Sequence, residues 1–323
     1  MPRTDSVIGD GLWLPLVTPL RHGAPDLRAA QQLAAHYAGA GVDGLIVLGT
    51  TGEGGLLTEA ERLMVTAAVL EVAQGRMPVM AGVGGVDTRS VCEQVRTLDR
   101  FDLAGYLVPP PYYLRVSDEG IAWHVRRVAS QTARPLMLYN VPKRTGSTIS
   151  PALALRLADH PQVVAIKECD RTGLRALAGQ DALRVFCGED AAMLDHLLAG
   201  GAGVVPAAAH IRPDLFVRLL QLARTGCDEA ARALFRQLSP LIDLMFAEPN
   251  PAPVKAALAL AGLARAEVRQ PLTPATRALT ARLEAAMALL PPAVFPPFPP
   301  SSLHIPTATG KMPDCLKNVH HVT

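Results

Sequence analysis

Lys167 is the residue whose type and position most directly indicate chemistry. It ends the apolar run Val163–Lys167, which has the length and composition of a buried strand. Burial of a lysine in a folded core favours its neutral form, and a neutral amine attacks carbonyl carbons to give a Schiff base. The alternatives are an ion pair with Glu168 and a side chain that extends to solvent.

Thr50, Thr51 and Tyr139 place hydroxyl groups at the ends of two further apolar runs. A chain of hydroxyls beside a reactive lysine could relay protons while a carbinolamine forms and loses water. Taken singly, the threonines are equally explained as turn residues and the tyrosine as a core residue. Arg144 could hold a substrate carboxylate through two hydrogen bonds, or could be a solvated loop arginine.

The elements that must position these residues are short apolar runs that alternate with helical patterns along the chain. Runs this apolar are typical of parallel strands that are covered on both faces. Eight such units predict a closed (β/α)8 barrel, in which catalytic groups lie at the carboxyl ends of the strands. A doubly wound sheet is the alternative, but its Gly-x-Gly-x-x-Gly turn is absent. The predicted strands are Leu12–Val17, Gly44–Leu48, Pro78–Ala81, Gly105–Val108, Leu136–Tyr139, Val163–Lys167, Arg184–Cys187 and Gly203–Val205.

Helix starts are visible between these runs. Thr58 and Glu61 have the spacing of a capping box, and Ser117 precedes two acidic residues that suit a first helical turn. Ser150 stands before Pro151, which predicts a cap followed by proline at the first helical position.

The pattern becomes purely helical after the eighth run and then ends in a proline-rich segment. The predicted domains are a barrel over 1–211, a helical bundle over 212–290 and an extended or disordered tail over 291–323. The predicted helices of the bundle are Pro213–Ala223, Asp228–Phe246, Pro253–Ala261 and Pro274–Leu290.

The composition favours an enzyme that handles small molecules. The chain of 323 residues is 49% hydrophobic and 19% charged, and its net charge of +2 gives no broad basic field for nucleic acid or membrane. No apolar run is long enough to cross a bilayer and no signal-peptide pattern is present, so we expect a cytoplasmic protein. The histidines show no metal-ligand spacing, and we expect no metal and no cofactor. Five cysteines without a CxxC pair predict mostly buried, reduced thiols.

Taken together, the motifs resemble the dihydrodipicolinate synthase and N-acetylneuraminate lyase superfamily from about Leu12 to Leu290. Two threonines in the glycine–threonine motif, Arg144 and the Glu-Pro-Asn-Pro string are similar to the synthase branch. The segments that carry the resemblance are Gly49–Glu53, Pro111–Tyr113, Tyr139–Gly146, Ile166–Glu168, Gly188–Asp190 and Glu248–Pro251.

The resemblance implies a carbon–oxygen lyase that forms a Schiff base with pyruvate and condenses it with L-aspartate 4-semialdehyde, in lysine and diaminopimelate biosynthesis. The implied catalytic residues are Lys167, Tyr139, Thr50 and Tyr113, with Tyr113 reaching across from a neighbouring subunit of a homotetramer. The implied substrate-binding residues are Thr51, Arg144, Gly188 and Val205.

Some positions depart from the family pattern. Gly54 replaces a serine or alanine, Pro110 replaces a threonine, and Pro206–His210 lacks the usual serine and asparagine. A pyruvate-dependent aldolase or hydro-lyase acting on another aldehyde therefore stays an alternative, as does a barrel that only binds a keto acid. Lysine-inhibited members carry asparagine and glutamate where this chain has Val86 and Ser90, which implies weak or no inhibition by lysine.

Overall fold

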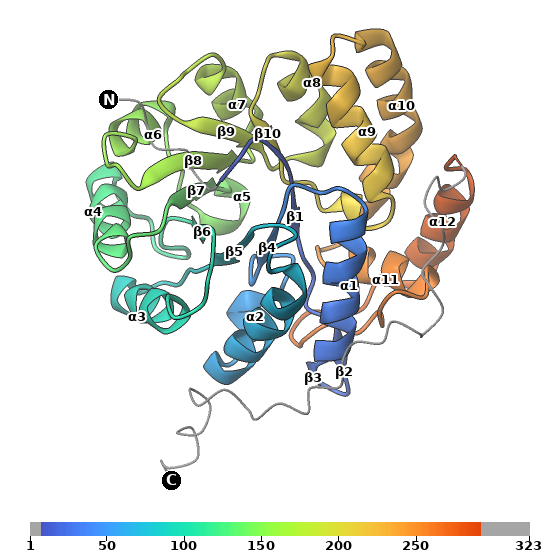
Figure 1. Ribbon diagram of the computed structural model, residues 1–323, viewed down its shortest axis with the longest axis horizontal. Helices are drawn as coiled ribbons and strands as arrows, with labels where there is room; N and C mark the ends of the chain where they lie inside the picture. Colours follow the sequence, from blue (N-terminus) through green and yellow to red (C-terminus); the bar gives the residue numbers. More distant parts are fainter. Residues whose placement is uncertain (1–7, 292–323) are drawn as a thin grey trace. The chain divides into compact units, whose positions relative to one another are not determined.

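The computed structural model describes residues 8–291, in which eight parallel strands close into a barrel (Figure 1). Neighbouring strands follow the order β1-β10-β9-β8-β7-β6-β5-β4, so each strand pairs with the next one along the chain and β1 closes the ring between β10 and β4. This arrangement confirms the predicted (β/α)8 barrel. The strands are β1 (Gly11–Pro15), β4 (Gly44–Val47), β5 (Val79–Gly82), β6 (Gly105–Val108), β7 (Leu136–Asn140), β8 (Val163–Glu168), β9 (Arg184–Cys187) and β10 (Gly203–Val204).

Two apolar cores explain why these strands are buried on both faces. Side chains that point outward pack under the helices, and side chains that point inward, such as Trp13, Met80 and Phe186, fill the barrel. Because side chains alternate along a strand, Lys167 lies on the same inward face of β8 as the buried Ala165.

A ring of helices covers the barrel, and the predicted caps begin three of them. Thr58 and Glu61 form a reciprocal capping box at the start of α2. The Ser117 hydroxyl accepts from Gly120 N, and Ser150 caps a helix whose first residue is proline. The helices of the ring are α1 (Leu27–Gly39), α2 (Glu59–Ala73), α3 (Thr88–Leu98), α4 (Asp118–Ala129), α6 (Pro151–Leu157), α7 (Arg171–Leu177), α8 (Met193–Leu198) and α9 (Pro213–Arg224).

Helix α9, which the sequence assigns to the bundle, packs against α8 and β1 and so covers the barrel. Three further helices follow it, namely α10 (Asp228–Met245), α11 (Ala252–Leu260) and α12 (Arg277–Ala288). Helix α12 begins three residues later than the Pro274 start that the sequence predicts. Thr276 caps it by accepting from Leu279 N at 3.2 Å, and Glu248 holds Thr276 in place by accepting from Thr276 N at 3.0 Å. All of the predicted tail except its first residue lies outside the described residues, and the domain boundaries stay predictions.

Some short elements were not expected. Strands β2 (Leu20–Arg21) and β3 (Ala24–Pro25) form a small antiparallel hairpin, and α5 (Pro142–Thr145) is a single helical turn. Across residues 8–291, no helix combines the length and the apolar character needed to cross a membrane.

The cysteines of the described range are all free, but only two of them, Cys92 and Cys187, are buried. Cys169 is partly exposed and Cys227 is exposed, so the expectation of mostly buried thiols is wrong for these two. Cys227 is exposed because it stands outside the barrel, directly before α10. Cys315 lies outside the described residues.

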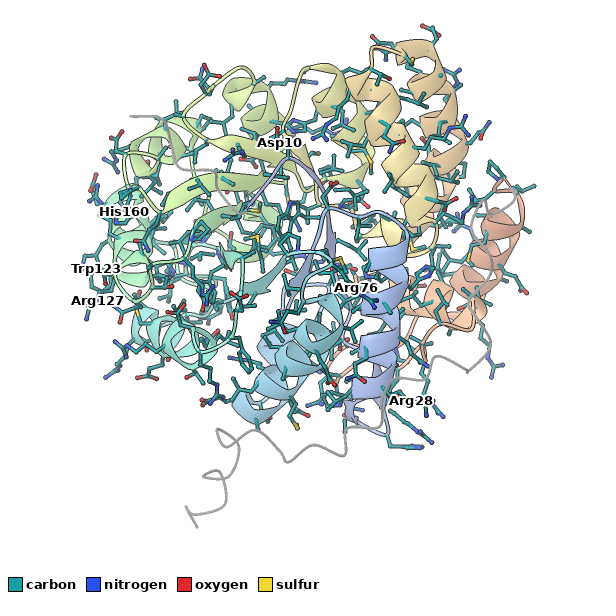
Figure 2. All side chains as sticks on the ribbon, in the orientation of Figure 1. Asp10, Arg28, Arg76, Trp123, Arg127 and His160 are labelled. Carbon is teal, nitrogen blue, oxygen red and sulfur yellow. The ribbon has the colours of Figure 1, made fainter. Side chains whose placement is uncertain are left out.

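Side chains on the outer faces of the helices point away from the barrel (Figure 2). Trp123 on α4 is 61% exposed, and Arg127, one turn further along the same helix, lies beside it at the edge of the view.

Candidate active site

A cavity of about 420 Å³ lies at the carboxyl ends of the strands, where barrel enzymes place their chemistry. All of the predicted site residues except Tyr113 line it. The residues that line the cavity and were predicted are Thr50, Thr51, Tyr139, Arg144, Lys167, Gly188 and Val205.

Lys167 is 6% exposed and lines this cavity. Its Nζ lies 4.6 Å from the centroid of the Tyr139 ring, and the two residues are paired in register between β7 and β8. The alternative of an ion pair with Glu168 does not fit, because Glu168 follows Lys167 directly in the strand and so faces the other way. The Glu168 carboxylate accepts instead from Asn140 Nδ2 at 2.9 Å.

Gly188 gives Lys167 the space that its side chain occupies. A Cβ atom at position 188 would lie 2.5 Å from Cys169 Sγ and 2.6 Å from Lys167 Cε. Contacts this short do not occur in folded proteins, so a larger residue would displace the lysine. The structure thus supplies a steric reason for glycine at this position.

Two hydroxyl groups lie close together beside the lysine. Thr50 Oγ1 and Tyr139 Oη are 3.4 Å apart, although 89 residues separate them in the sequence. Tyr139 is the last residue but one of β7 and Thr50 follows β4, so the closure of the barrel brings them together. Their separation is within the range of a weak hydrogen bond, and it leaves a path for a proton between them.

Arg144 and Tyr113 lie at the outer edge of the site. Arg144 is exposed on α5 and lines the cavity from its rim. Tyr113 is 88% exposed and has a left-handed backbone with φ of 72°, while its backbone N–H donates to Thr145 O at 3.2 Å. This single chain therefore does not place the Tyr113 side chain in its own cavity.

Asp190 belongs to a segment that carries the family resemblance but was not predicted as a site residue, and it lines the same cavity and is 2% exposed. Burial raises its pKa to about 7, although backbone N–H groups of Ala208 and Ala207 and the charge of Lys167 oppose the rise. The Ala208 N–H donates to Asp190 Oδ2 at 2.8 Å, which fixes the orientation of the carboxylate. A group with this pKa can exchange a proton near neutral pH.

Two residues that hold the Gly49–Gly54 loop were also not predicted as site residues. Asn250 Nδ2 donates to Thr51 Oγ1 at 2.9 Å, and Lys255 on α11 forms an ion pair with Glu53. A signal for Lys255 exists in the sequence, because it is the only charged residue in the otherwise apolar helix Ala252–Leu260. A charge in such a helix is rarely buried unless it has a partner.

A closed parallel (β/α)8 barrel with a lysine in a cavity at the strand ends defines the chain as a barrel enzyme. Residues 10–289 match the model of the dihydrodipicolinate synthetase family, and the chain belongs to this family.

Relatives and solved structures of high similarity agree with this assignment. The chain is 37% identical over 283 residues to 4-hydroxy-tetrahydrodipicolinate synthase of Anaeromyxobacter sp. (strain K), an alignment covering 86% of this chain and 96% of that protein. It is 38% identical to 4-hydroxy-tetrahydrodipicolinate synthase 1 of Streptomyces coelicolor, over 84% of this chain and 90% of the relative. The dihydrodipicolinate synthase of Acinetobacter baumannii, solved in complex with pyruvate, superposes with a TM-score of 0.84 at 31% identity, covering 87% of this chain and 98% of that one.

Proposed function

We propose that this protein is a lyase that condenses pyruvate with L-aspartate 4-semialdehyde to form 4-hydroxy-tetrahydrodipicolinate, a step of lysine and diaminopimelate biosynthesis. The observation that carries the proposal is the buried Lys167 amine in the cavity at the barrel mouth. The names of the relatives and the pyruvate complex of a solved neighbour support the choice of substrates.

The chemistry begins at the Lys167 amine. It adds to the carbonyl carbon of pyruvate, and loss of water from the carbinolamine leaves an iminium ion. The iminium accepts electrons, so a methyl proton of the bound pyruvate can leave to give an enamine. The enamine carbon then attacks the aldehyde carbon of the second substrate, and that substrate's own amine displaces Lys167 as the ring closes.

The proton transfers in this sequence need a relay, and we assign it to Tyr139, Thr50 and Tyr113. The 3.4 Å contact between Thr50 and Tyr139 supports the first part of the relay. Tyr113 would complete it from a neighbouring subunit, since its side chain is 88% exposed and does not line the cavity of its own chain. The proposed assembly is a homotetramer built as a dimer of dimers, in the cytoplasm.

Substrate binding falls to residues around the lysine. We propose that Arg144 binds the carboxylate of aspartate semialdehyde, because it lines the cavity at its rim and its guanidinium can donate two parallel hydrogen bonds. Thr51, Gly188 and Val205 would hold pyruvate or shape its pocket. Weak or absent inhibition by lysine stays a prediction.

Trapping with borohydride tests the proposal. Incubation with pyruvate and borohydride should leave a reduced pyruvyl adduct on the Lys167 peptide, detected by mass spectrometry, and Lys167→Ala should leave none. A coupled assay should then show turnover of aspartate semialdehyde. An adduct with faster turnover of sialic acid or a 2-keto-3-deoxy sugar acid would favour another aldolase of the same fold, and an adduct without turnover of any aldehyde would favour a keto-acid-binding barrel.

A further inference from the structure

The loop that carries Thr50 is tied to helix α11 by a fully buried ion pair. Lys255 Nζ contacts Glu53 Oε1, and the two side chains are 0% and 1% exposed. Lys255 Nζ also donates to Glu267 O at 2.8 Å, and the second carboxylate oxygen of Glu53 accepts from Arg269 N at 2.7 Å. In Figure 1, α11 is drawn in orange beside α12, against which it packs.

An ion pair in this position is a poor source of stability. Removing both charges from water costs about as much free energy as their attraction returns, and apolar side chains of the same volume would often stabilise a core equally well. Burial lowers the pKa of Lys255, while the charge of Glu53 raises it. The pair instead fixes the position of the Glu53 loop relative to α11.

The loop needs such a constraint because its backbone is strained. Leu48 and Glu53 have left-handed φ angles of 59° and 55°, which side chains other than glycine rarely adopt. A Cβ atom at Gly54 would lie 2.0 Å from Leu48 O, so the chain folds back tightly on itself. Strained backbone persists only where surrounding contacts fix it.

The constraint reaches Thr50 through a short path. The backbone N–H of Glu53 donates to Thr50 O at 3.1 Å, so the residue that holds Lys255 also holds the backbone of Thr50. Thr50 Oγ1 in turn lies 3.4 Å from Tyr139 Oη.

We infer that Lys255 is a positioning residue for catalysis: through Glu53 it fixes the loop so that the Thr50 hydroxyl meets Tyr139. The inference rests on the proposed function. It makes α11 part of the active-site support rather than an appendage to the barrel.

The test measures how fast pyruvate becomes trappable by borohydride in single turnovers of the full chain. Lys255→Met should lower the maximal rate at least about tenfold, because the relay no longer has its geometry. The pyruvate concentration that gives half the maximal rate should change by less than about twofold, because Lys255 does not touch the substrate.

A double-mutant cycle separates positioning from general destabilisation. In a Thr50→Val background, Lys255→Met should slow the reaction by less than about twofold, because the group that it positions is already gone. Arg134→Met is the matched control, since it removes a partly buried ion pair with Asp99 on the opposite face of the barrel. It should lower the melting temperature and leave the trapping rate unchanged.

Suppose that the wild type traps pyruvate. If Lys255→Met then slows trapping equally in both backgrounds, or does not slow it at all, the inference is overturned. If the wild type traps none, the proposed function fails and the inference fails with it. If Lys255→Met does not fold, the neutral double variant Glu53→Gln/Lys255→Met replaces it, because removing both charges avoids an unpaired buried one. This variant should show the same slow trapping, and a wild-type rate in it would contradict the inference.

Discussion

At the scale of single residues, the site depends on space as much as on reactive groups. Lys167 extends over the Tyr139 ring and past position 188, where only a hydrogen atom fits. The contact of Nζ with the Tyr139 ring and the space left at position 188 together set the direction of the Lys167 amine.

Gly188→Ala tests this packing. The new methyl group would collide with Lys167 Cε and Cys169 Sγ, and we expect the rate of borohydride trapping to fall at least about 100-fold. Gly39→Ala is the control, because a Cβ atom there meets nothing within 4 Å. Both variants should keep the far-UV circular dichroism of the wild type, and unchanged trapping in Gly188→Ala would show that the lysine tolerates the shift.

At the scale of elements, a buried carboxylate joins β7, β8 and α7 behind the active site. Glu168 on β8 accepts from Asn140 on β7 and, at 2.7 Å, from the backbone N–H of Asp170, the residue that caps α7. Burial raises the pKa of Glu168 from 4.5 to about 7, although these hydrogen bonds oppose the rise. The native state therefore holds this proton at pH values where the unfolded chain has lost it.

This difference predicts how stability changes with pH. Between pH 4.5 and about 7 the native state binds more protons at Glu168 than the unfolded state does, so the stability from this group is lost as the pH rises. Glu168→Gln carries no such proton. From pH 5 to pH 8 its free energy of unfolding in urea should rise relative to the wild type by on the order of 2 kcal/mol.

Glu284→Gln, at an exposed position on α12, serves as the control. Its free energy of unfolding should change with pH as that of the wild type does over the same range. If the free energy of unfolding of Glu168→Gln also changes with pH as that of the wild type does, Glu168 has the same pKa in the folded and unfolded chains.

At the scale of the whole molecule, one chain leaves its proposed relay incomplete. Tyr113 and the neighbouring Leu114 are 88% and 47% exposed, although both are large and apolar. Exposed groups of this kind are typical of surfaces that another subunit covers. If Tyr113 enters a neighbouring cavity, each active site is shared between two chains.

Complementation between inactive variants tests this sharing. Tyr113→Phe and Lys167→Ala should each be nearly inactive, yet refolding them together should restore about a quarter of the wild-type activity, because each mixed dimer then has one intact site. In the control, the double variant Tyr113→Phe/Lys167→Ala refolded with an equal amount of wild type should halve the activity of that wild type, because the mixed dimers then have no intact site and only the re-formed wild-type dimers are active. Mixed oligomers detected by native mass spectrometry without any activity would place Tyr113 outside the relay.

The sequence by itself determined the barrel and the lysine. Strand and helix signals are local, and the bounds of Gly105–Val108 and Arg184–Cys187 match β6 and β9 residue for residue. The start of α12 was misplaced because a distant residue, Glu248, holds its cap. Only the tertiary structure decided which groups meet: the pairs Thr50–Tyr139 and Glu53–Lys255 depend on how the barrel closes. The physical reason is that periodicity encodes which face of an element is buried, whereas side-chain contacts between distant segments follow from strand register and helix docking.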